Sequence, residues 1–191
     1  MKKQIILIIT IIATISCKSQ TVTLDMATYG TNDFNNSGEY LKDFDNNLDK
    51  FIGAWKWEEG NSSFIIEFEK REMVSYQPYF NYYADIIIGK YKYVENGIEI
   101  VNNLNQSFDY IFYPIKTSFN QSNLNNLYIS FIDYTKDKSG KGHIELDTTT
   151  NPPQFLWSVG GNSKVLIDGE TSIEGWSLPI GSYNQKILIK Q

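Results

Sequence analysis

Short runs of alternating apolar and polar residues follow one another from residue 53 to the end of the chain. GAWKWEE (53–59) and SFIIEFEKR (63–71) place apolar side chains at every second position. Because successive side chains of a strand point to opposite faces, this period of two predicts strands with one apolar face. Gly60 and Asn61, between the two segments, predict a hairpin turn.

A second hairpin is predicted over residues 85–103, where Glu95, Asn96 and Gly97 separate two alternating runs. No helix-length segment with an apolar period lies between the strand-like segments, which excludes a βαβ arrangement. An antiparallel meander hides its edges by closing or by folding into two sheets. We therefore predict an all-β fold, an antiparallel up-and-down barrel of about eight to ten strands over residues 41–191. The remaining strands are predicted within 107–119, 126–135, 142–150, 153–159, 164–168 and 185–190.

The residues before the barrel have a different pattern. Leu41, Phe44, Leu48 and Phe51 are spaced by three, four and three residues, which predicts a short helical turn at the N-terminal end of the barrel. Residues 17–40 are polar, rich in Gly, Asn and Ser, and have no sustained period. We predict a flexible tether there.

The first residues have the pattern of an export signal. Two lysines precede an eleven-residue apolar run from Ile5 to Ile15. A membrane-spanning helix needs about 20 apolar residues, so a cleaved signal peptide over residues 1–16 is favoured over a retained membrane helix.

The position of Cys17 directly after this run resembles a bacterial lipobox. Ile15 and Ser16 match that motif, whereas Thr14 stands where Leu is usual. The resemblance implies cleavage before Cys17, a lipid on Cys17 and an outer-membrane lipoprotein of the cell envelope. Cleavage near residues 19–20, which releases a soluble secreted or periplasmic protein, is the alternative.

Charge and cysteine content narrow the function classes. The chain has 22 acidic and 17 basic residues, a net charge of −5, and Arg71 is its only arginine. Nucleic-acid binding needs clustered Lys and Arg to neutralise phosphates, so no nucleic-acid partner is expected. Cys17 is the only cysteine, which excludes an intramolecular disulfide.

Phe51, Gly53 and Trp55 form a Phe-x-Gly-x-Trp motif at the entry to the first barrel strand. This motif resembles the first signature of lipocalins and lipocalin-like proteins. The resemblance implies that the tryptophan closes one end of the barrel and that a basic residue of the last strand covers its ring. Lys186 and Lys190 are the candidates, in place of the usual arginine.

Two further likenesses are weaker in sequence detail. Asp133 and Tyr134 resemble part of the second lipocalin signature, with Ile132 where Thr is usual. The layout of the whole chain also resembles a family of uncharacterised Gram-negative lipoproteins, a domain of unknown function, and that likeness implies no activity.

Aromatic side chains are the candidate ligand-lining residues. The inward-facing set is Trp57, Phe64, Phe68, Tyr91 and Tyr93, which either line a cavity or fill the barrel. A second cluster lies in the proline-broken stretch of residues 76–83, where tyrosine rings suit a wet pocket or the stacking of sugars. Its candidate ligand-lining residues are Tyr79 and Tyr82, and its other members are Tyr76, Phe80 and Tyr83. Packing and loop cover are the alternative role for this cluster.

Candidate chemistry is sparse. His143, Glu145 and Asp147 alternate on one predicted strand, where exposure to solvent is favoured over metal binding. Glu67, Glu69 and Glu99 are predicted to lie on a solvated outer face, and "SGKG" (139–142) to form a hairpin turn. The sequence thus predicts no catalytic residue, metal or cofactor.

The sequence predicts a non-catalytic lipocalin-like binding protein for a small apolar or amphipathic molecule or a glycan. A structural or protein-interaction lipoprotein with a solid barrel is the alternative, and an enzyme ranks last.

Overall fold

The computed structural model describes residues 21–30, 32–109, 112–135, 138–163 and 186–191, the last four residues of 138–163 by backbone alone. The predicted signal peptide, Cys17 and the strand predicted at 164–168 lie outside the described residues. Almost all regular structure in the described part is strand, and the short 3-10 helix η1 (Asp49–Phe51) lies just before the barrel. The strands are β1 (Thr23–Asp25), β2 (Tyr40–Lys42), β3 (Gly53–Glu59), β4 (Ser62–Ser75), β5 (Tyr83–Glu95), β6 (Ile98–Asn102), β7 (Ile115–Phe119), β8 (Asn126–Asp133), β9 (Lys138–Asp147), β10 (Gln154–Ser163) and β11 (Lys186–Lys190).

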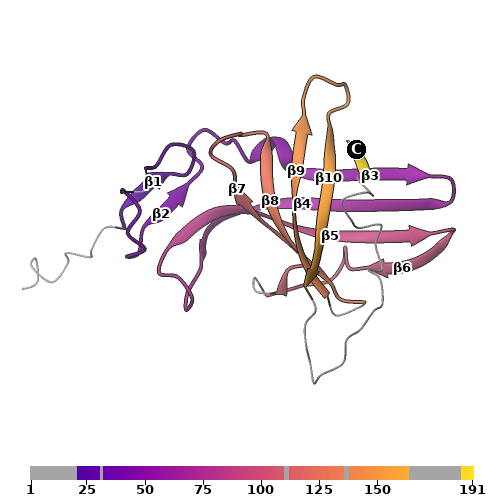
Figure 1. Cartoon of the computed structure of the whole chain (residues 1–191), viewed down its shortest axis with the longest axis horizontal. Helices are drawn as coiled ribbons and strands as arrows, with labels where there is room; N and C mark the ends of the chain where they lie inside the picture. Colours follow the sequence, from indigo (N-terminus) through magenta and orange to yellow (C-terminus); the bar gives the residue numbers. More distant parts are fainter. Residues whose placement is uncertain (1–20, 31, 110–111, 136–137, 164–185) are drawn as a thin grey trace, which may run out of the picture.

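Eight of these strands form a closed antiparallel barrel (Figure 1). Each barrel strand pairs with the next one along the chain, in the order β3, β4, β5, β7, β8, β9, β10 and β11. The last strand then pairs with the first, since Ile189 and Lys190 of β11 lie opposite Lys56 and Trp55 of β3. The predicted all-β, up-and-down antiparallel barrel is therefore confirmed.

Strands β4 and β5 are longer than the barrel and extend past it. The first residue of β3, Gly53, pairs with Phe68, so the rest of β4 runs beyond that end of β3. One edge of β5 has three partners in turn, namely β2 at Tyr83, β7 at Ile88 and β6 from Lys92 onward. Figure 1 shows the result: β1 and β2 lie beside one end of the long β4–β5 pair, and the β3–β4 and β5–β6 turns lie at the other end.

The folded part of the chain begins earlier than the predicted tether allows. β1 pairs in parallel with β2, which in turn pairs in parallel with β5. Met26 is only 5% exposed and belongs to the hydrophobic core. Within the predicted tether, residues 21–30 and 32–40 are therefore part of the folded domain, because Leu24 and Met26 pack against apolar partners there that the local sequence pattern does not reveal.

Two local predictions are wrong in detail. The stripe at residues 41–51 is not one helical face: Leu41 lies in β2, Phe44 is exposed, and only the one-turn η1 near Phe51 is helical. Residues 139–142 are not a turn but the middle of β9. A side chain at Gly142 has no room, since a Cβ there would lie 2.0 Å from the carbonyl oxygen of Ser158 on β10.

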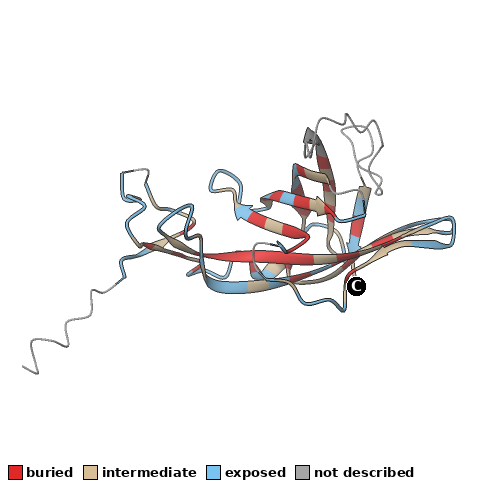
Figure 2. Cartoon of the chain, turned by 90° about the horizontal axis from the view of Figure 1, so that it is seen from below, coloured by how far each residue is buried: buried red, intermediate tan, exposed pale blue. Residues whose placement is uncertain are grey.

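Alternation along the strands sets the burial pattern, which Figure 2 displays along the ribbon. In β4, Phe64, Ile66 and Phe68 are buried, whereas Glu67 and Glu69 between and beside them are exposed. Glu99 of β6 is also exposed and pairs with Lys92. The predicted solvated outer face for these glutamates is confirmed.

The Phe-x-Gly-x-Trp motif spans η1 and the start of β3. The Trp55 indole is fully buried, and its Nε1 donates a hydrogen bond of 2.8 Å to the carbonyl oxygen of Phe51. Lys190 of the last strand places its Nζ 5.3 Å from the centre of the Trp55 ring, and donates a 3.3 Å hydrogen bond to the Lys50 carbonyl. The expectation that a basic residue of the last strand covers this ring holds for Lys190, and Lys186 covers Trp57 instead, at 4.1 Å.

Gly53 adopts a φ of +113°, a backbone conformation that is costly for residues with a Cβ. We expect Gly53→Ala to lower the free energy of unfolding by about 1–3 kcal/mol. Urea unfolding followed by tryptophan fluorescence measures this loss. Gly30→Ala is the control, because Gly30 is exposed and has no positive φ, so a loss as large in the control contradicts the explanation.

Candidate functional site

The inward-facing aromatic residues predicted as ligand-lining pack against one another. Phe64 and Tyr91 meet Phe131 and Trp157 from the opposite wall, and the four rings form a closed circuit. Their centroids are separated by 6.0 Å (Phe64–Tyr91), 5.4 Å (Phe64–Trp157), 5.9 Å (Phe131–Trp157) and 5.1 Å (Tyr91–Phe131). Rings from β4 and β5 thus touch rings from β8 and β10 across the barrel, so the interior is filled with side chains at this level.

The other predicted lining residues do not come together in one cavity. Phe68 is buried against Phe155, and Tyr93 is buried beside Phe64. Trp57 is partly exposed beneath Lys186, and Tyr79 is 80% exposed. Of the residues predicted to line a site, only Tyr82 lies in the pocket described next.

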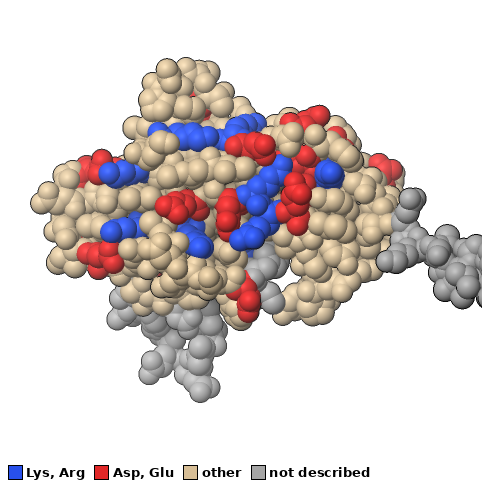
Figure 3. All heavy atoms as spheres, turned by 180° about the vertical axis from the view of Figure 1, so that it is seen from behind, with Lys and Arg blue, Asp and Glu red and all other residues tan. Residues whose placement is uncertain are grey.

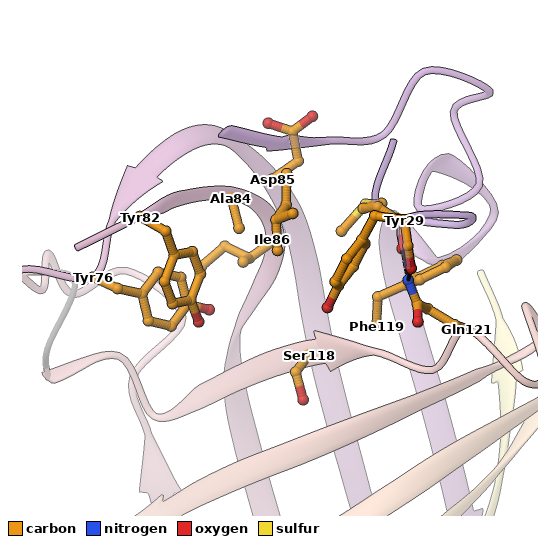
Figure 4. Close-up of a pocket in the computed structure, with 11 residues that line it drawn as sticks. Tyr29, Tyr76, Tyr82, Ala84, Asp85, Ile86, Ser118, Phe119 and Gln121 are labelled. Carbon is orange, nitrogen blue, oxygen red and sulfur yellow. Dashed lines mark hydrogen bonds between the residues drawn. The ribbon is translucent and has the colours of Figure 1, made fainter. Parts of the chain in front are cut away.

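A pocket of about 120 Å³ lies outside the barrel, against the extended ends of β4 and β5 (Figure 4). Three stretches that are far apart in the sequence supply its walls: the residues after β1, the β4–β5 connection, and the end of β7 with the residues that follow. Ala84 and Ile86 of β5 form part of its lining, because alternate residues of a strand share a face. We call it the tyrosine pocket; its lining residues are Met26, Tyr29, Leu41, Tyr76, Tyr82, Ala84, Asp85, Ile86, Ser118, Phe119 and Gln121.

Aromatic rings pack in and around the tyrosine pocket. Tyr76 and Tyr82 are stacked, with centroids 4.5 Å apart and planes 16° apart. Figure 4 shows this pair on one side of the pocket and the Tyr29 ring on the other. Phe34 packs edge-on against Tyr82 at 5.0 Å and lies 5.8 Å from Tyr29. The rings of Tyr29, Tyr76 and Tyr82 thus border the pocket, and Phe34 packs against two of them.

Apart from Asp85, the polar side chains that line the pocket are neutral hydrogen-bonding groups. Burial, with smaller effects of Tyr76 and Tyr29, raises the pKa of Tyr82 above its ordinary value, so its hydroxyl keeps its proton. Ser118 adds a hydroxyl. The amide of Gln121 donates to the carbonyl oxygens of Met26 (3.1 Å) and Tyr29 (3.4 Å), and so ties the β7–β8 connection to the N-terminal wall.

A buried carboxylate holds the wall behind the pocket in place. Asp85 is 1% exposed, and Figure 4 shows its carboxylate pointing away from the tyrosines. It accepts hydrogen bonds from the Tyr40 hydroxyl (2.5 Å) and from the backbone N–H groups of Asp43 and Met73 (3.0 Å each). Burial, together with the hydrogen bond and charge of Asp85, raises the pKa of Tyr40. Met73 lies in a bulge of β4 with a φ of +50°, where its N–H reaches Asp85 in place of a regular ladder partner.

A second buried carboxylate, Asp43, anchors the chain between β2 and η1. Its carboxylate accepts hydrogen bonds from the backbone N–H groups of Asn47 (2.7 Å) and Leu48 (2.9 Å). It also forms an ion pair with Lys70, at 2.9 Å. Lys70 also pairs with Asp49 at 3.0 Å. These contacts fasten the N-terminal segment to β4.

The candidate ligands on β9 do not form a metal site in the described part of the chain. Groups of three or more His, Cys, Asp or Glu side chains placed to hold a metal ion are absent from the residues that the structure describes. His143 and Glu145 are exposed on β9, and Asp147 accepts hydrogen bonds from Thr149 in the turn that follows. Figure 3 shows acidic and basic side chains interleaved across one face. Ion pairs among the described residues include Lys56–Glu58 and Arg71–Glu69.

Sequence reasoning missed Tyr29, Phe34, Phe119 and Gln121 as site residues. The first two lie in the segment predicted to be a tether, and no strand or helix period marks them. Isolated aromatic residues in an otherwise polar segment were the one sequence signal for these positions. Such residues are typical of side chains that pack against another part of the domain.

The chain belongs to a family whose function is not known. The model of that family, described as "Family of unknown function (DUF6705)", matches residues 1–191. Searches of curated proteins and of solved structures found no match. Among the described residues, no helix has the length and apolar character needed to cross a membrane.

The Lys70–Asp43 pair generates a prediction about stability and pH. Burial lowers the pKa of Lys70, but the hydrogen bonds and charges of Asp43 and Asp49 outweigh it and raise the pKa above its ordinary value. A raised lysine pKa stabilises the fold below the unfolded-state pKa of about 10.4, and the contribution is lost as the pH rises through the folded-state pKa. We expect Lys70→Met to lower the free energy of unfolding by about 1–3 kcal/mol at neutral pH, because Asp43 then lacks its cation.

Urea unfolding at neutral pH and at about pH 11.5 checks both parts of this expectation. The difference between wild type and Lys70→Met should narrow at the higher pH, and a constant difference contradicts the assignment. Lys92→Met is the control at neutral pH, since Lys92 pairs with exposed Glu99 and its loss should cost less than about 0.5 kcal/mol.

Proposed function

We propose that this protein is a non-catalytic binding protein of the bacterial cell envelope, anchored by a lipid on Cys17, which binds a glycan through the tyrosine pocket. In this proposal the barrel is a lipocalin-like scaffold with a filled interior, and the ligand sits outside it. The pocket itself is the observation that carries the proposal: a small space among Tyr29, Tyr76 and Tyr82 with hydroxyl and amide groups in its lining.

The size of the pocket favours one ring of a larger ligand. Sites that enclose a whole drug-sized molecule usually measure about 300–1,000 Å³. The tyrosine pocket measures about 120 Å³, which is closer to the cavity of about 150 Å³ that encloses a benzene molecule. A single six-membered ring is therefore the favoured occupant, and an entire lipid is not.

The chemistry of the lining favours a hydroxylated ring. The faces of Tyr76, Tyr82 and Tyr29 offer apolar surfaces on which a pyranose ring stacks. The tyrosine hydroxyls and Ser118 are neutral donors and acceptors suited to sugar hydroxyls. No charged side chain points into the pocket in Figure 4, since the Asp85 carboxylate is turned away, so a charged ligand is not favoured.

The lipocalin likeness supports the scaffold part of the proposal. Trp55 is buried, Lys190 covers its ring, and the first and last strands pair, as that family pattern implies. The ligand site differs from the expectation of an interior cavity. Fold alone assigns no activity, so the proposal rests on the pocket.

A structural or protein-interaction lipoprotein is the second candidate. The filled barrel interior favours it, as do the strongly exposed Tyr79 and Phe80 beside the pocket. The two candidates differ in which tyrosine matters: Tyr82 for a glycan, and Tyr79 for a protein surface.

Tyr82→Ala tests the glycan proposal. Because this substitution removes one ring of the stacked pair, we expect it to weaken saccharide binding about tenfold or more. A glycan array selects the saccharide, and isothermal titration calorimetry measures its affinity for wild type and variants. Tyr82→Phe keeps the ring without the hydroxyl and should show an intermediate loss.

Tyr128→Ala is the matched control, because Tyr128 is a half-exposed tyrosine on β8 that does not line the pocket. Failure of every saccharide to bind, or equal affinities for wild type and Tyr82→Ala, contradicts the proposal. Mass spectrometry of the native N-terminus tests the anchor separately, and an unmodified Cys17 contradicts that part.

A further inference from the structure

The end of the molecule with the tyrosine pocket is also where the chain enters the domain from the predicted anchor. Thr21 is the first described residue, and the carbonyl oxygen of Val22 accepts a hydrogen bond of 2.8 Å from Tyr40 of β2. Only three residues, 18–20, separate Cys17 from Thr21. Even fully extended, the four Cα–Cα steps from Cys17 to Thr21 span about 14 Å at most.

Three uncharged segments meet at this end. Residues 21–24, 34–38 and 73–84 contain no Asp, Glu, Lys or Arg, although a fifth of the whole chain is charged. Gly38 donates to the Asn81 carbonyl at 2.6 Å, and the Asn81 N–H donates to Asn36 Oδ1 at 2.8 Å, so the second and third segments touch. Val22 and Asn81 line the same shallow depression, which joins the first segment to them. Glu39 also lines it, but this residue is only 4% exposed and its carboxylate accepts hydrogen bonds from the backbone and hydroxyl of Ser37.

These segments expose apolar and aromatic side chains to solvent. Val22 is 59% exposed, Tyr79 is 80% exposed and Phe80 is 53% exposed. We call these three residues with their uncharged segments the uncharged end. In Figure 3, which shows the molecule from behind, the lobe beneath the charged band on the side of the N-terminal trace carries neither red nor blue atoms.

We propose that the uncharged end rests on the lipid bilayer, with Val22, Tyr79 and Phe80 in the headgroup region. The inference depends on the lipid anchor of the proposed function, because the short link from Cys17 is what holds this end at the membrane. Tyrosine and phenylalanine rings partition well into the membrane interface, where an apolar ring and a polar tip are both satisfied. The lack of charge removes the desolvation cost that charged side chains pay near hydrocarbon.

This seating sets the orientation of the whole protein. β4 and β5 run from the uncharged end to the β3–β4 and β5–β6 turns, which then point away from the membrane (Figure 1). The tyrosine pocket, whose Tyr76 and Tyr82 belong to the same connection as Tyr79, lies next to the headgroups. A protein partner placed on the same residues is the competing occupant.

Quenching of an introduced tryptophan by brominated lipids tests the seating. The lipid-anchored protein is reconstituted in vesicles of phosphatidylethanolamine and phosphatidylglycerol with brominated acyl chains. Tyr79→Trp and, independently, Val22→Trp are compared with Ile98→Trp, a 66% exposed position on β6 at the opposite end. The emission of the four native tryptophans, measured in the unsubstituted protein, is subtracted.

We expect the indoles introduced by Tyr79→Trp and Val22→Trp to emit at shorter wavelength on vesicles and to be quenched at least twofold more than that of Ile98→Trp. Equal quenching at both ends, or stronger quenching for Ile98→Trp, overturns the proposal. An unquenched indole in both Tyr79→Trp and Val22→Trp also overturns it, and is the result expected of a surface for a protein partner.

The outcome is separable from the fate of the natural anchor. If the native protein proves to carry an unmodified Cys17, the full chain is coupled through this single cysteine to a maleimide lipid and the same comparison is made. A free native Cys17 overturns the anchor in the proposed function, whereas the quenching pattern decides the seating alone.

Discussion

The hydrogen bonds between β11 and β3 close the sheet, and this closure constrains every other feature of the molecule. Once the first and last strands pair, the inward side chains of eight strands share one enclosed space. In this protein those side chains are large: rings of Phe64, Tyr91, Phe131 and Trp157 meet across the interior. Aromatic rings that large leave the barrel core packed where they meet, so the interior has no room for a ligand at that level.

The excess length of β4 and β5 creates a surface outside the barrel. Strands that run past the barrel carry an apolar face with no opposite wall, and the N-terminal segment covers it through β1, β2 and Met26. Two buried carboxylates fasten this cover: Asp85 binds Tyr40, Asp43 and the bulge at Met73, and Asp43 binds Lys70. Because short chain segments rather than regular strands complete the cover, a gap remains among their tyrosines. The candidate binding site is therefore a consequence of how an overlong hairpin is covered.

Most of the barrel was predictable from local pattern. The period of two located the strands, and the Asn96-Gly97 turn, with positive φ at both residues, has the backbone that this sequence favours in two-residue hairpins. The contact of Lys190 with Trp55 was also expected, because the resemblance to lipocalins implies that a basic residue of the last strand covers this ring. Errors arose where local pattern and tertiary environment disagree. Leu41 and Phe51 match a helical spacing, yet Leu41 belongs to β2, a strand that pairs with β5.

The sequence by itself determined the alternation of faces, the turns at Gly60–Asn61 and Asn96–Gly97, and the Phe-x-Gly-x-Trp motif before and in β3, since each depends on residues that are neighbours in the chain. Only the tertiary structure decided which aromatic rings became core and which became site. Tyr91 and Tyr82 look alike in sequence, but one meets Phe131 across the barrel and the other meets Phe34 outside it. Tyr29, Tyr76 and Phe119 reach one pocket through strand pairings between distant parts of the chain, and long-range pairing of that kind leaves no periodic trace in the local sequence.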